Sequence, residues 1–200
     1  MKHIFSKGSD AAKPTLILFH GTGGNEHDLL PLGEALSPGS SLLGVRGNVL
    51  ENGMPRFFRR LSEGVFDEED LIFRTRETKS FLDEAAAEYG FDPGNLIAVG
   101  YSNGANIAGS LLFHYGPLFR GAALLHPMVP MRGLTLPSLA DVAVFIGAGT
   151  NDPLIRPEET RELTALLEGA GAAVSLHWSN QGHRLSQDEA LAARTWLAGL

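Results

Sequence analysis

The fold is decided by the stretch Leu96-Ile97-Ala98-Val99-Gly100-Tyr101-Ser102-Asn103-Gly104. Four apolar residues lead into Gly-Tyr-Ser-Asn-Gly and small residues follow, so the stretch predicts a buried strand, a very tight turn and a helix. Glycine at positions 100 and 104 has no Cβ, which lets the strand and the helix approach closely enough for that turn. Ser102 then lies at the apex, as in the G-x-S-x-G turn that holds a nucleophilic serine above a sheet. The alternative is an ordinary glycine-rich turn with an incidental serine.

The composition is that of an acidic globular protein. The chain has 200 residues, of which 44% are hydrophobic and 20% charged, and its formal net charge is −7. This length suits one domain, residues 1–200, and the negative charge argues against a nucleic-acid partner. There is no cysteine, which excludes disulfides, thiolate metal sites and a cysteine nucleophile. Residues 1–14 do not resemble a signal peptide and no apolar run reaches the roughly 20 residues of a membrane span, so we expect a cytoplasmic enzyme.

Short apolar runs alternate with helical patterns along the rest of the chain. This alternation predicts an α/β fold with a doubly wound, mostly parallel sheet. One helix is expected to be capped by Asn25, and the last helix by a capping box that starts at Ser186 and to bury Leu200. Between them, the segment from Arg46 to Phe66 is expected to be a long irregular loop. The predicted strands are residues 16–19, 41–45, 96–99, 121–125, 141–147 and 174–178.

Three residues at the ends of predicted strands match a catalytic order. In sheets of this kind the active site lies at the carboxyl ends of the strands, and hydrolases on them present Ser, then Asp or Glu, then His. Here Ser102, Asp152 and His183 follow in that order. His183 would take the proton of the serine hydroxyl, and Asp152 would orient the imidazole. Taken singly, Asp152 before a proline could be a turn residue, and His183 in a glycine loop could simply be exposed.

The same chemistry requires hydrogen-bond donors for a tetrahedral oxyanion. The backbone N–H of Asn103 follows the nucleophile and lies at the start of a helix, where free N–H groups and the positive dipole end are found. Thr22, in the glycine-rich loop after the first parallel strand, is the expected second donor, and Gly23 is the second choice for that role.

Two other histidines also end predicted strands. His20 is expected to support its loop rather than to take part in catalysis. His126 is the rival for the base, but it precedes Asp152 in the chain, which is the wrong order for this fold. The alternative for His126 is that it lines the substrate pocket.

Together these residues carry a family resemblance. The motifs His20-Gly21-Thr22-Gly23, Gly-Tyr-Ser-Asn-Gly, Asn151-Asp152-Pro153 and Gly182-His183 resemble those of the bacterial carboxylesterase/phospholipase family of α/β-hydrolases, which is similar to the acyl-protein thioesterases. The segment 46–60 looks like the branch associated with resistance to hydroquinones and catechols. The thioesterases usually have glutamine where this chain has Asn103, which weakens a transfer of substrate. The resemblance implies a compact α/β-hydrolase fold without a large lid and with an open, shallow site.

The segment 46–66 is the candidate wall of the substrate pocket. Small-molecule sites need apolar surface, and this segment offers Met54, Phe57, Phe58 and Phe66. The alternative is that these side chains only pack the segment onto the sheet.

The sequence therefore predicts a serine carboxylesterase that hydrolyses small carboxylic esters through an acyl-enzyme at Ser102, without a cofactor or metal. One alternative is a thioesterase that acts on acylated proteins or carriers. Another is a non-catalytic ligand-binding protein on a hydrolase scaffold. The expected partner is a small-molecule ester, and a homodimer is one option for the oligomeric state.

Overall fold

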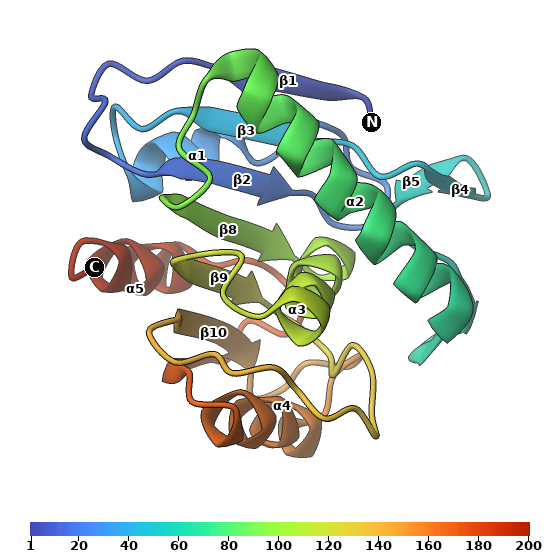
Figure 1. Cartoon of the computed structure of the whole chain (residues 1–200). Coiled ribbons are helices and arrows are strands. Elements are labelled where there is room, and N and C mark those ends of the chain that lie inside the picture. Colours follow the sequence, from blue (N-terminus) through green and yellow to red (C-terminus); the bar gives the residue numbers. More distant parts are fainter.

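A computed structural model describes residues 1–200, and its centre is a seven-stranded sheet (Figure 1). Six of its strands run parallel to one another, and only the first strand of the chain is antiparallel, which confirms the expected doubly wound sheet. In spatial order the strands are β1 (His3–Ser6), β3 (Leu42–Val45), β2 (Thr15–Phe19), β8 (Leu96–Tyr101), β9 (Gly121–Leu125), β10 (Ala143–Gly149) and β11 (Ala173–Ser179).

The sequence pattern missed β1. This strand pairs antiparallel with β3, from His3 opposite Val45 to Ser6 opposite Leu42. It lies at the edge of the sheet and its side chains are partly exposed. An edge strand of four residues needs no continuous apolar run, whereas strands buried on both faces do, so the usual signal is absent here.

Five helices cover the two faces of the sheet, because side chains alternate between the faces along each buried strand. In β2, Leu16 and Leu18 belong to one apolar cluster, and Ile17 and Phe19 belong to the other. The first cluster includes α1 (Leu30–Leu36) and α5 (Gln187–Leu197), and the second includes α2 (Glu68–Tyr89), α3 (Asn103–Tyr115) and α4 (Pro157–Gly169) (Figure 1).

The helix ends follow the sequence in part. Ser186 and Glu189 form the expected capping box of α5. The expected cap by Asn25 is wrong: α1 begins only at Leu30, and the Asn25 side chain instead holds a turn by donating to the Asp28 carboxylate. Leu200 is not buried either, because α5 ends before it.

The segment expected to be an irregular loop consists of two short hairpins. β4 (Val49–Glu51) pairs with β5 (Met54–Arg56), and β6 (Arg60–Ser62) pairs with β7 (Val65–Phe66). Strands of two or three residues are too short for a pattern of alternating polarity to be recognised. The hairpins lie beside the carboxyl ends of β2 and β8 and contact the loops that follow these strands. No large lid covers these loops.

The order in which strands are added to the sheet changes direction between β2 and β8. From β2 it goes to β3 on one side, and from β8 it continues to β9, β10 and β11 on the other. At such a switch point the loops after the two central strands diverge and leave a crevice for a ligand. Here these loops contain Thr22 and Ser102.

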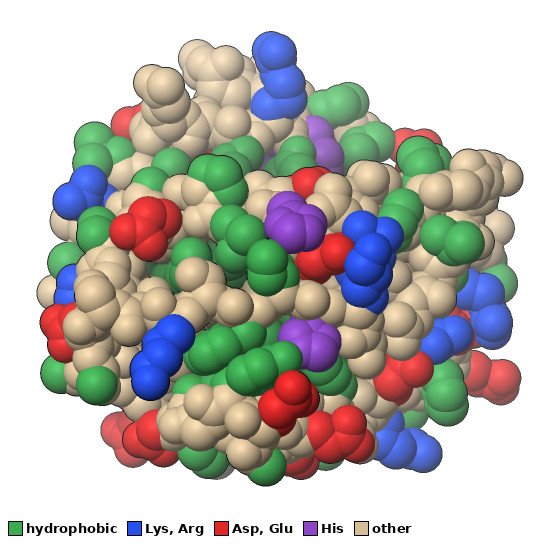
Figure 2. Space-filling model, turned by 90° about the horizontal axis from the view of Figure 1, so that it is seen from above, with side chains coloured by type: hydrophobic (Ala, Val, Ile, Leu, Met, Phe, Trp, Pro, Cys, Tyr) green, Lys and Arg blue, Asp and Glu red, His purple; other side chains and the backbone are tan.

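One face of the surface is shown in Figure 2, where acidic, basic and apolar side chains are interspersed and no continuous basic stripe crosses the face. None of the helices combines the length and the apolar character required to cross a bilayer.

Candidate active site

Ser102 lies in a strained turn between β8 and α3. Its backbone has φ 52° and ψ −115°, in the region that side-chain-bearing residues rarely adopt. A Cβ on Gly100 would lie 2.5 Å from the carbonyl oxygen of Gly104, and a Cβ on Gly104 would lie 2.0 Å from that of Phe19. Only glycine at both positions allows β2, β8 and α3 to approach this closely, as the sequence predicts.

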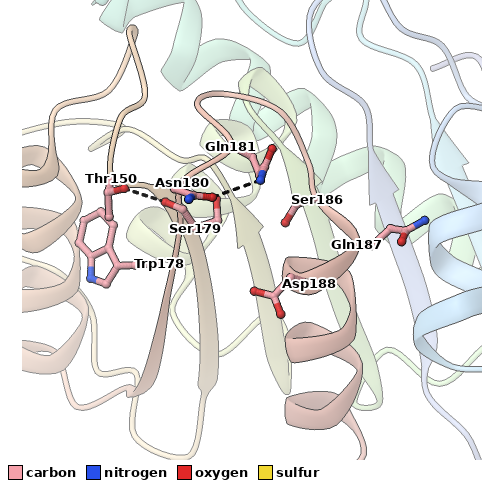
Figure 3. A pocket seen from close by; sticks show the side chains of 8 residues that line it. All are labelled: Thr150, Trp178, Ser179, Asn180, Gln181, Ser186, Gln187 and Asp188. Carbon is pink, nitrogen blue, oxygen red and sulfur yellow. Dashed lines mark hydrogen bonds between the residues drawn. The ribbon is translucent and has the colours of Figure 1, made fainter.

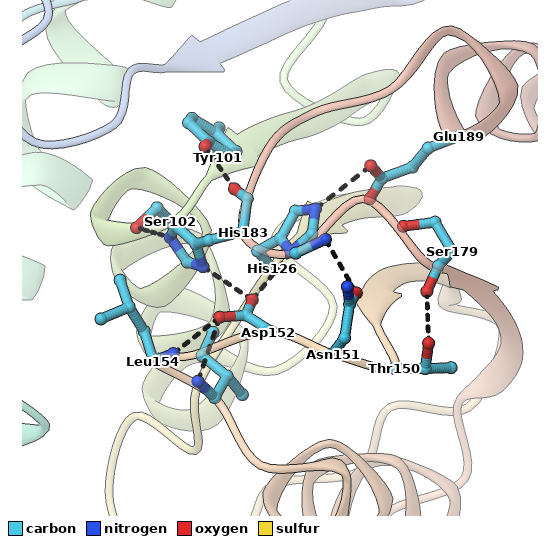
Figure 4. A network of polar contacts seen from close by, with 12 residues as sticks. Tyr101, Ser102, His126, Thr150, Asn151, Asp152, Leu154, Ser179, His183 and Glu189 are labelled. Carbon is cyan, nitrogen blue, oxygen red and sulfur yellow. Dashed lines mark hydrogen bonds and ion pairs between the residues drawn. The ribbon is translucent and has the colours of Figure 1, made fainter.

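The structure brings together the three residues that chain order selected (Figure 4). The Ser102 Oγ lies 2.9 Å from Nε2 of His183, and Nδ1 of His183 lies 2.7 Å from Oδ2 of Asp152. The side chain of Asp152 is 2% exposed and that of His183 is 19% exposed. Both histidine nitrogens therefore have partners, and the hydroxyl end of the array faces the solvent.

The Asp152 carboxylate is fixed on both oxygens. Oδ1 accepts hydrogen bonds from the backbone N–H groups of Leu154 and Ile155, at 2.8 and 3.2 Å. Burial raises the pKa of Asp152, but the N–H of Leu154 and the two imidazoles at Oδ2 outweigh it, so that the pKa is lowered overall. The carboxylate is therefore ionised at neutral pH.

The loop that carries His183 is held by contacts that the sequence did not suggest. The Tyr101 hydroxyl donates to the backbone carbonyl of His183, at 2.6 Å. The N–H of Gly182 donates to Oδ1 of Asn151, at 2.9 Å. Tyr101, which had no role in the sequence analysis, therefore links the serine turn to the histidine loop.

A further pair, His126 and Glu189, lies behind Asp152. Nδ1 of His126 is 3.1 Å from Oδ2 of Asp152, and Nε2 is 3.2 Å from Oε2 of Glu189. Burial lowers the pKa of His126, but the hydrogen bond and charge of Glu189, together with those of Asp152, raise it overall. His126 thus borders the cleft, but its side chain is fully buried and supports Asp152 rather than facing Ser102. Glu189 was missed as a site residue because its capping-box position already explained it.

The expected oxyanion donors are free of other partners. No protein acceptor pairs with the backbone N–H of Thr22 or of Asn103, whereas the N–H of Gly23 donates to the carbonyl of Pro55. This favours Thr22 over Gly23. The Asn103 side chain has a separate structural function, since its Oδ1 accepts from the N–H of Phe57 at 2.7 Å. That bond ties the serine turn to the hairpin segment.

The cleft above Ser102 has a volume of about 240 Å³. Its floor is formed by the serine, the histidines and the start of α3, and its walls are partly apolar and partly charged. Among the wall residues are Phe66, Met128, Leu154, Ile155, Arg56, Arg60 and Glu63.

The expected pocket wall needs correction, because only Phe66 of the four candidates lies on this cleft. Phe57 and Phe58 are 1% and 0% exposed. The Phe57 ring packs against Phe19, and the Phe58 ring packs against Phe66. Met54 is exposed outside the cleft, beside Gly23. Phe57 and Phe58 therefore pack the hairpins onto the sheet, which is the alternative that the sequence left open.

Arg56 connects the hairpins to the loop of Thr22. Its Nη1 donates to the Thr22 hydroxyl at 2.8 Å, and its Nε donates to the carbonyl of Phe58 at 3.2 Å. Glu51 lies 3.6 Å from Arg56 and 2.9 Å from Arg60, so that one carboxylate serves two guanidinium groups. Arg56 and Arg60, together with Glu63, therefore give the hairpin side of the cleft charges of both signs.

His20 has the structural surroundings expected of it. It is buried, its Nδ1–H donates to the carbonyl of Gly21 at 2.6 Å, and its Nε2 accepts from the N–H of Gly47 at 3.1 Å. Burial lowers its pKa, so it is neutral and holds two loops together.

A metal ligand set is one other interpretation of the buried groups. His126, Asp152 and His183 offer ligand atoms that all lie within 4.8 Å of one another. Each of these atoms already takes part in a hydrogen bond between the three residues, and the remaining ring nitrogens face Ser102 and Glu189. We therefore interpret the cluster as a hydrogen-bond network.

A second hollow, of about 600 Å³, lies on the other side of the histidine loop (Figure 3). Its lining is polar and shares no residue with the cleft above Ser102. It is bordered by Thr150, Trp178, Ser179, Asn180, Gln181, Ser186, Gln187 and Asp188.

Comparisons with known proteins agree with this geometry. The sequence model of the dienelactone hydrolase family matches residues 61–195. MhqD of Bacillus subtilis (strain 168), a protein named as a hydrolase, is 61% identical over 196 residues, which cover 98% of this chain and 97% of MhqD. The crystal structure of a Bacillus cereus carboxylesterase superposes with a TM-score of 0.98 and 62% identity, over 100% of this chain and 94% of that one.

A more distant relative is acyl-protein thioesterase 1 of Cryptococcus neoformans. It is 25% identical over 175 residues, which cover 78% of this chain and 73% of the thioesterase.

Proposed function

Since the chain belongs to the dienelactone hydrolase family and has the α/β-hydrolase fold, it is a hydrolase, and we propose that it is a serine carboxylesterase for small carboxylic esters. Its nucleophile is Ser102, its general base is His183, and Asp152 orients the base. Residues 1–200 act as one domain, in the cytoplasm, and neither a metal nor a cofactor takes part.

The reaction proceeds through an acyl-enzyme. His183 Nε2 takes the proton of the Ser102 hydroxyl as Oγ attacks the ester carbonyl carbon. The backbone N–H groups of Thr22 and Asn103 donate to the oxyanion, the bond to the alcohol oxygen breaks, and His183 returns the proton to the leaving alcohol. Water then attacks the acyl carbon with His183 again as base, and the carboxylic acid leaves Ser102.

One observation carries this proposal: a serine hydroxyl in a strained glycine turn lies 2.9 Å from an imidazole whose other nitrogen lies 2.7 Å from a buried carboxylate. A serine hydroxyl is a weak nucleophile unless a base lies within hydrogen-bond reach. Aligning all three groups at the ends of three strands has no evident benefit for folding alone.

The shape and charge of the cleft support small substrates. A volume of about 240 Å³ is below the range of about 300–1,000 Å³ of drug-sized ligand pockets. Arg56, Arg60 and Glu63 make one wall polar and charged. These features favour a short, polar ester over a long acyl chain.

The test is hydrolysis of p-nitrophenyl acetate by the wild-type protein and by Ser102→Ala. We expect wild-type turnover and a loss of about 10⁴-fold or more in kcat for the variant. Ser110→Ala is the matched control, because Ser110 is buried on α3, away from the cleft. Full activity of a folded Ser102→Ala protein would refute the proposal.

A second candidate is a thioesterase, because acyl-protein thioesterase 1 is a distant relative and the same groups can attack a thioester. The comparison that separates the two uses acetyl esters and acetyl thioesters with matched leaving groups. A higher kcat/KM for the oxygen ester is expected, and a consistent preference for the thioester would favour the second candidate.

A further inference from the structure

We propose that His126 and Glu189 form a buried support that positions Asp152, so that the catalytic array continues from Ser102 through His183, Asp152 and His126 to Glu189 (Figure 4). The inference rests on the proposed serine esterase function and adds two positioning residues to it. The side chains of His126 and Glu189 hydrogen-bond to Asp152 and to each other, not to Ser102.

The pair is inaccessible to solvent. The side chains of His126 and Glu189 are both 0% exposed. His126 follows β9 and has φ 52°, and its N–H donates to the carbonyl of Gly147 in β10. Glu189 comes from the first turn of α5, and a Cβ on Gly147 would lie only 1.9 Å from its Oε1. Three elements are therefore shaped to bring this carboxylate to this imidazole.

The contacts define the charge state of His126. A neutral imidazole has one N–H donor, whereas the imidazolium has two. Both ring nitrogens of His126 face carboxylate oxygens, at 3.1 and 3.2 Å. The other titratable groups around the ring are His183 and Tyr101, whose ring centroids lie 5.1 and 5.9 Å away. The two buried carboxylates stabilise a cation between them, and the raised pKa of His126 agrees with this.

Asp152 gains a fourth hydrogen bond from this arrangement. Two backbone N–H groups bind Oδ1, and His183 and His126 both bind Oδ2. Because Oδ2 is the atom that holds His183, a donor on its far side restricts rotation of the carboxylate. The imidazolium also places a positive charge near His183, which opposes protonation of the base.

The experiment uses two substitutions, each of which keeps one of the two hydrogen bonds of the His126 ring. His126→Asn places its amide nitrogen where Nδ1 was and can still donate to Asp152, whereas His126→Gln reaches the position of Nε2 and Glu189. We expect His126→Gln to lose about 10- to 100-fold in kcat, with KM within twofold of wild type. His126→Asn should retain at least five times more kcat than His126→Gln.

The pH profile separates positioning and charge from a purely structural function. Both variants lack the cation beside His183, so the acid-side fall of kcat/KM should move to higher pH by the same amount in both. A purely structural histidine would lower the amount of folded protein without moving that limb. His177→Asn and His177→Gln are the matched controls, because His177 in β11 also pairs with a carboxylate of the first turn of α5, Asp188, but at the surface.

Glu189→Gln is the variant to use if the histidine variants fail to fold, because glutamine has the same shape as glutamate. It removes the charge that stabilises the imidazolium. The lost cation lies nearer to His183 than the lost carboxylate does, so the acid limb should move to higher pH, by less than in the His126 variants, while kcat stays within about fivefold of wild type. Equal kcat for the two His126 variants, or an unmoved limb in Glu189→Gln, would overturn the inference. Activity in Ser102→Ala would instead refute the esterase proposal, so the two failures are distinguishable.

Discussion

The two sides of the cleft are built in different ways. On the sheet side, Ser102, His126, Asp152 and His183 come from loops at the ends of parallel strands and are joined by side-chain hydrogen bonds, mostly out of contact with solvent. On the other side, the segment 46–66 forms two hairpins whose strands carry exposed apolar side chains, and its contacts are arginine–carboxylate pairs and packed phenylalanines.

This difference assigns a separate task to each side. Loops anchored in a central sheet keep catalytic groups within the small tolerances that the chemistry demands. The hairpins contribute a wall of charged side chains and, through Arg56, a support for the loop of Thr22. We therefore expect substitutions on the sheet side to affect kcat, and those on the hairpin side to affect stability, KM or the oxyanion donors.

The largest expected effect is on the sheet side. Asp152→Asn should lower kcat for p-nitrophenyl acetate by about 10⁴-fold, because the amide no longer selects the histidine tautomer that accepts the serine proton. Asp188→Asn is the control, since Asp188 is 76% exposed and pairs only with His177. A loss of less than tenfold in Asp152→Asn would contradict the assignment of the sheet side.

On the hairpin side, Phe57→Ala tests whether this phenylalanine is part of the core rather than of the pocket. Its ring is buried against Phe19, so the free energy of unfolding should fall by about 3–5 kcal/mol. Met54→Ala, at an exposed position of the same segment, should change it by less than about 0.5 kcal/mol. Urea denaturation measures both, and a stable Phe57→Ala protein with altered KM would restore Phe57 to the pocket.

Arg56→Met tests the contact between the two sides, because Arg56 of the hairpins donates to the hydroxyl of Thr22. Without the guanidinium the Thr22 hydroxyl loses its donor, and the loop with the oxyanion N–H is less well placed. We expect kcat to fall by about 10- to 100-fold. Arg59→Met removes a surface arginine that pairs with Asp67 and should leave kcat unchanged. Identical kinetics of the two variants would show that the hairpins do not support the oxyanion donors.

The smallest effect concerns the pH dependence of stability. The pKa of His126 is raised above its ordinary value of 6.5, so its contribution is complete below that pH and is lost as the pH rises through the folded-state pKa. Asp152 has a lowered pKa, so its contribution is constant above pH 6. Between pH 6 and 9 the free energy of unfolding of the wild type should therefore fall more than that of His126→Asn. Parallel curves from urea denaturation would contradict a charged His126.

The sheet side could be predicted from the sequence because its signals are local and ordered. Buried parallel strands are continuous apolar runs. In a parallel sheet the residue that follows each run lies at the carboxyl end of its strand, where the active site is expected. This placed Ser102, Asp152 and His183 after predicted strands, and in the structure they follow β8, β10 and β11. The edge strand β1 lacked such a run, and the hairpin strands are too short to show one.

The contacts of Phe57 and Glu189 could not be predicted, for a different reason. Phe57 packs against Phe19, and Glu189 reaches His126 across 63 positions of the chain. An aromatic residue has the same pattern whether it faces a pocket or the core. A glutamate in a capping box gives no sign that its carboxylate also meets a buried histidine. Such information lies in the tertiary structure alone.

Covalent labelling tests whether Ser102 is the nucleophile. The wild-type protein is incubated with a fluorophosphonate, and the modified residue is located by peptide mass spectrometry. We predict one adduct per chain, on Ser102, formed in step with the loss of esterase activity and absent in Ser102→Ala. Labelling of another residue, or complete resistance to the reagent while ester hydrolysis continues, would contradict the account.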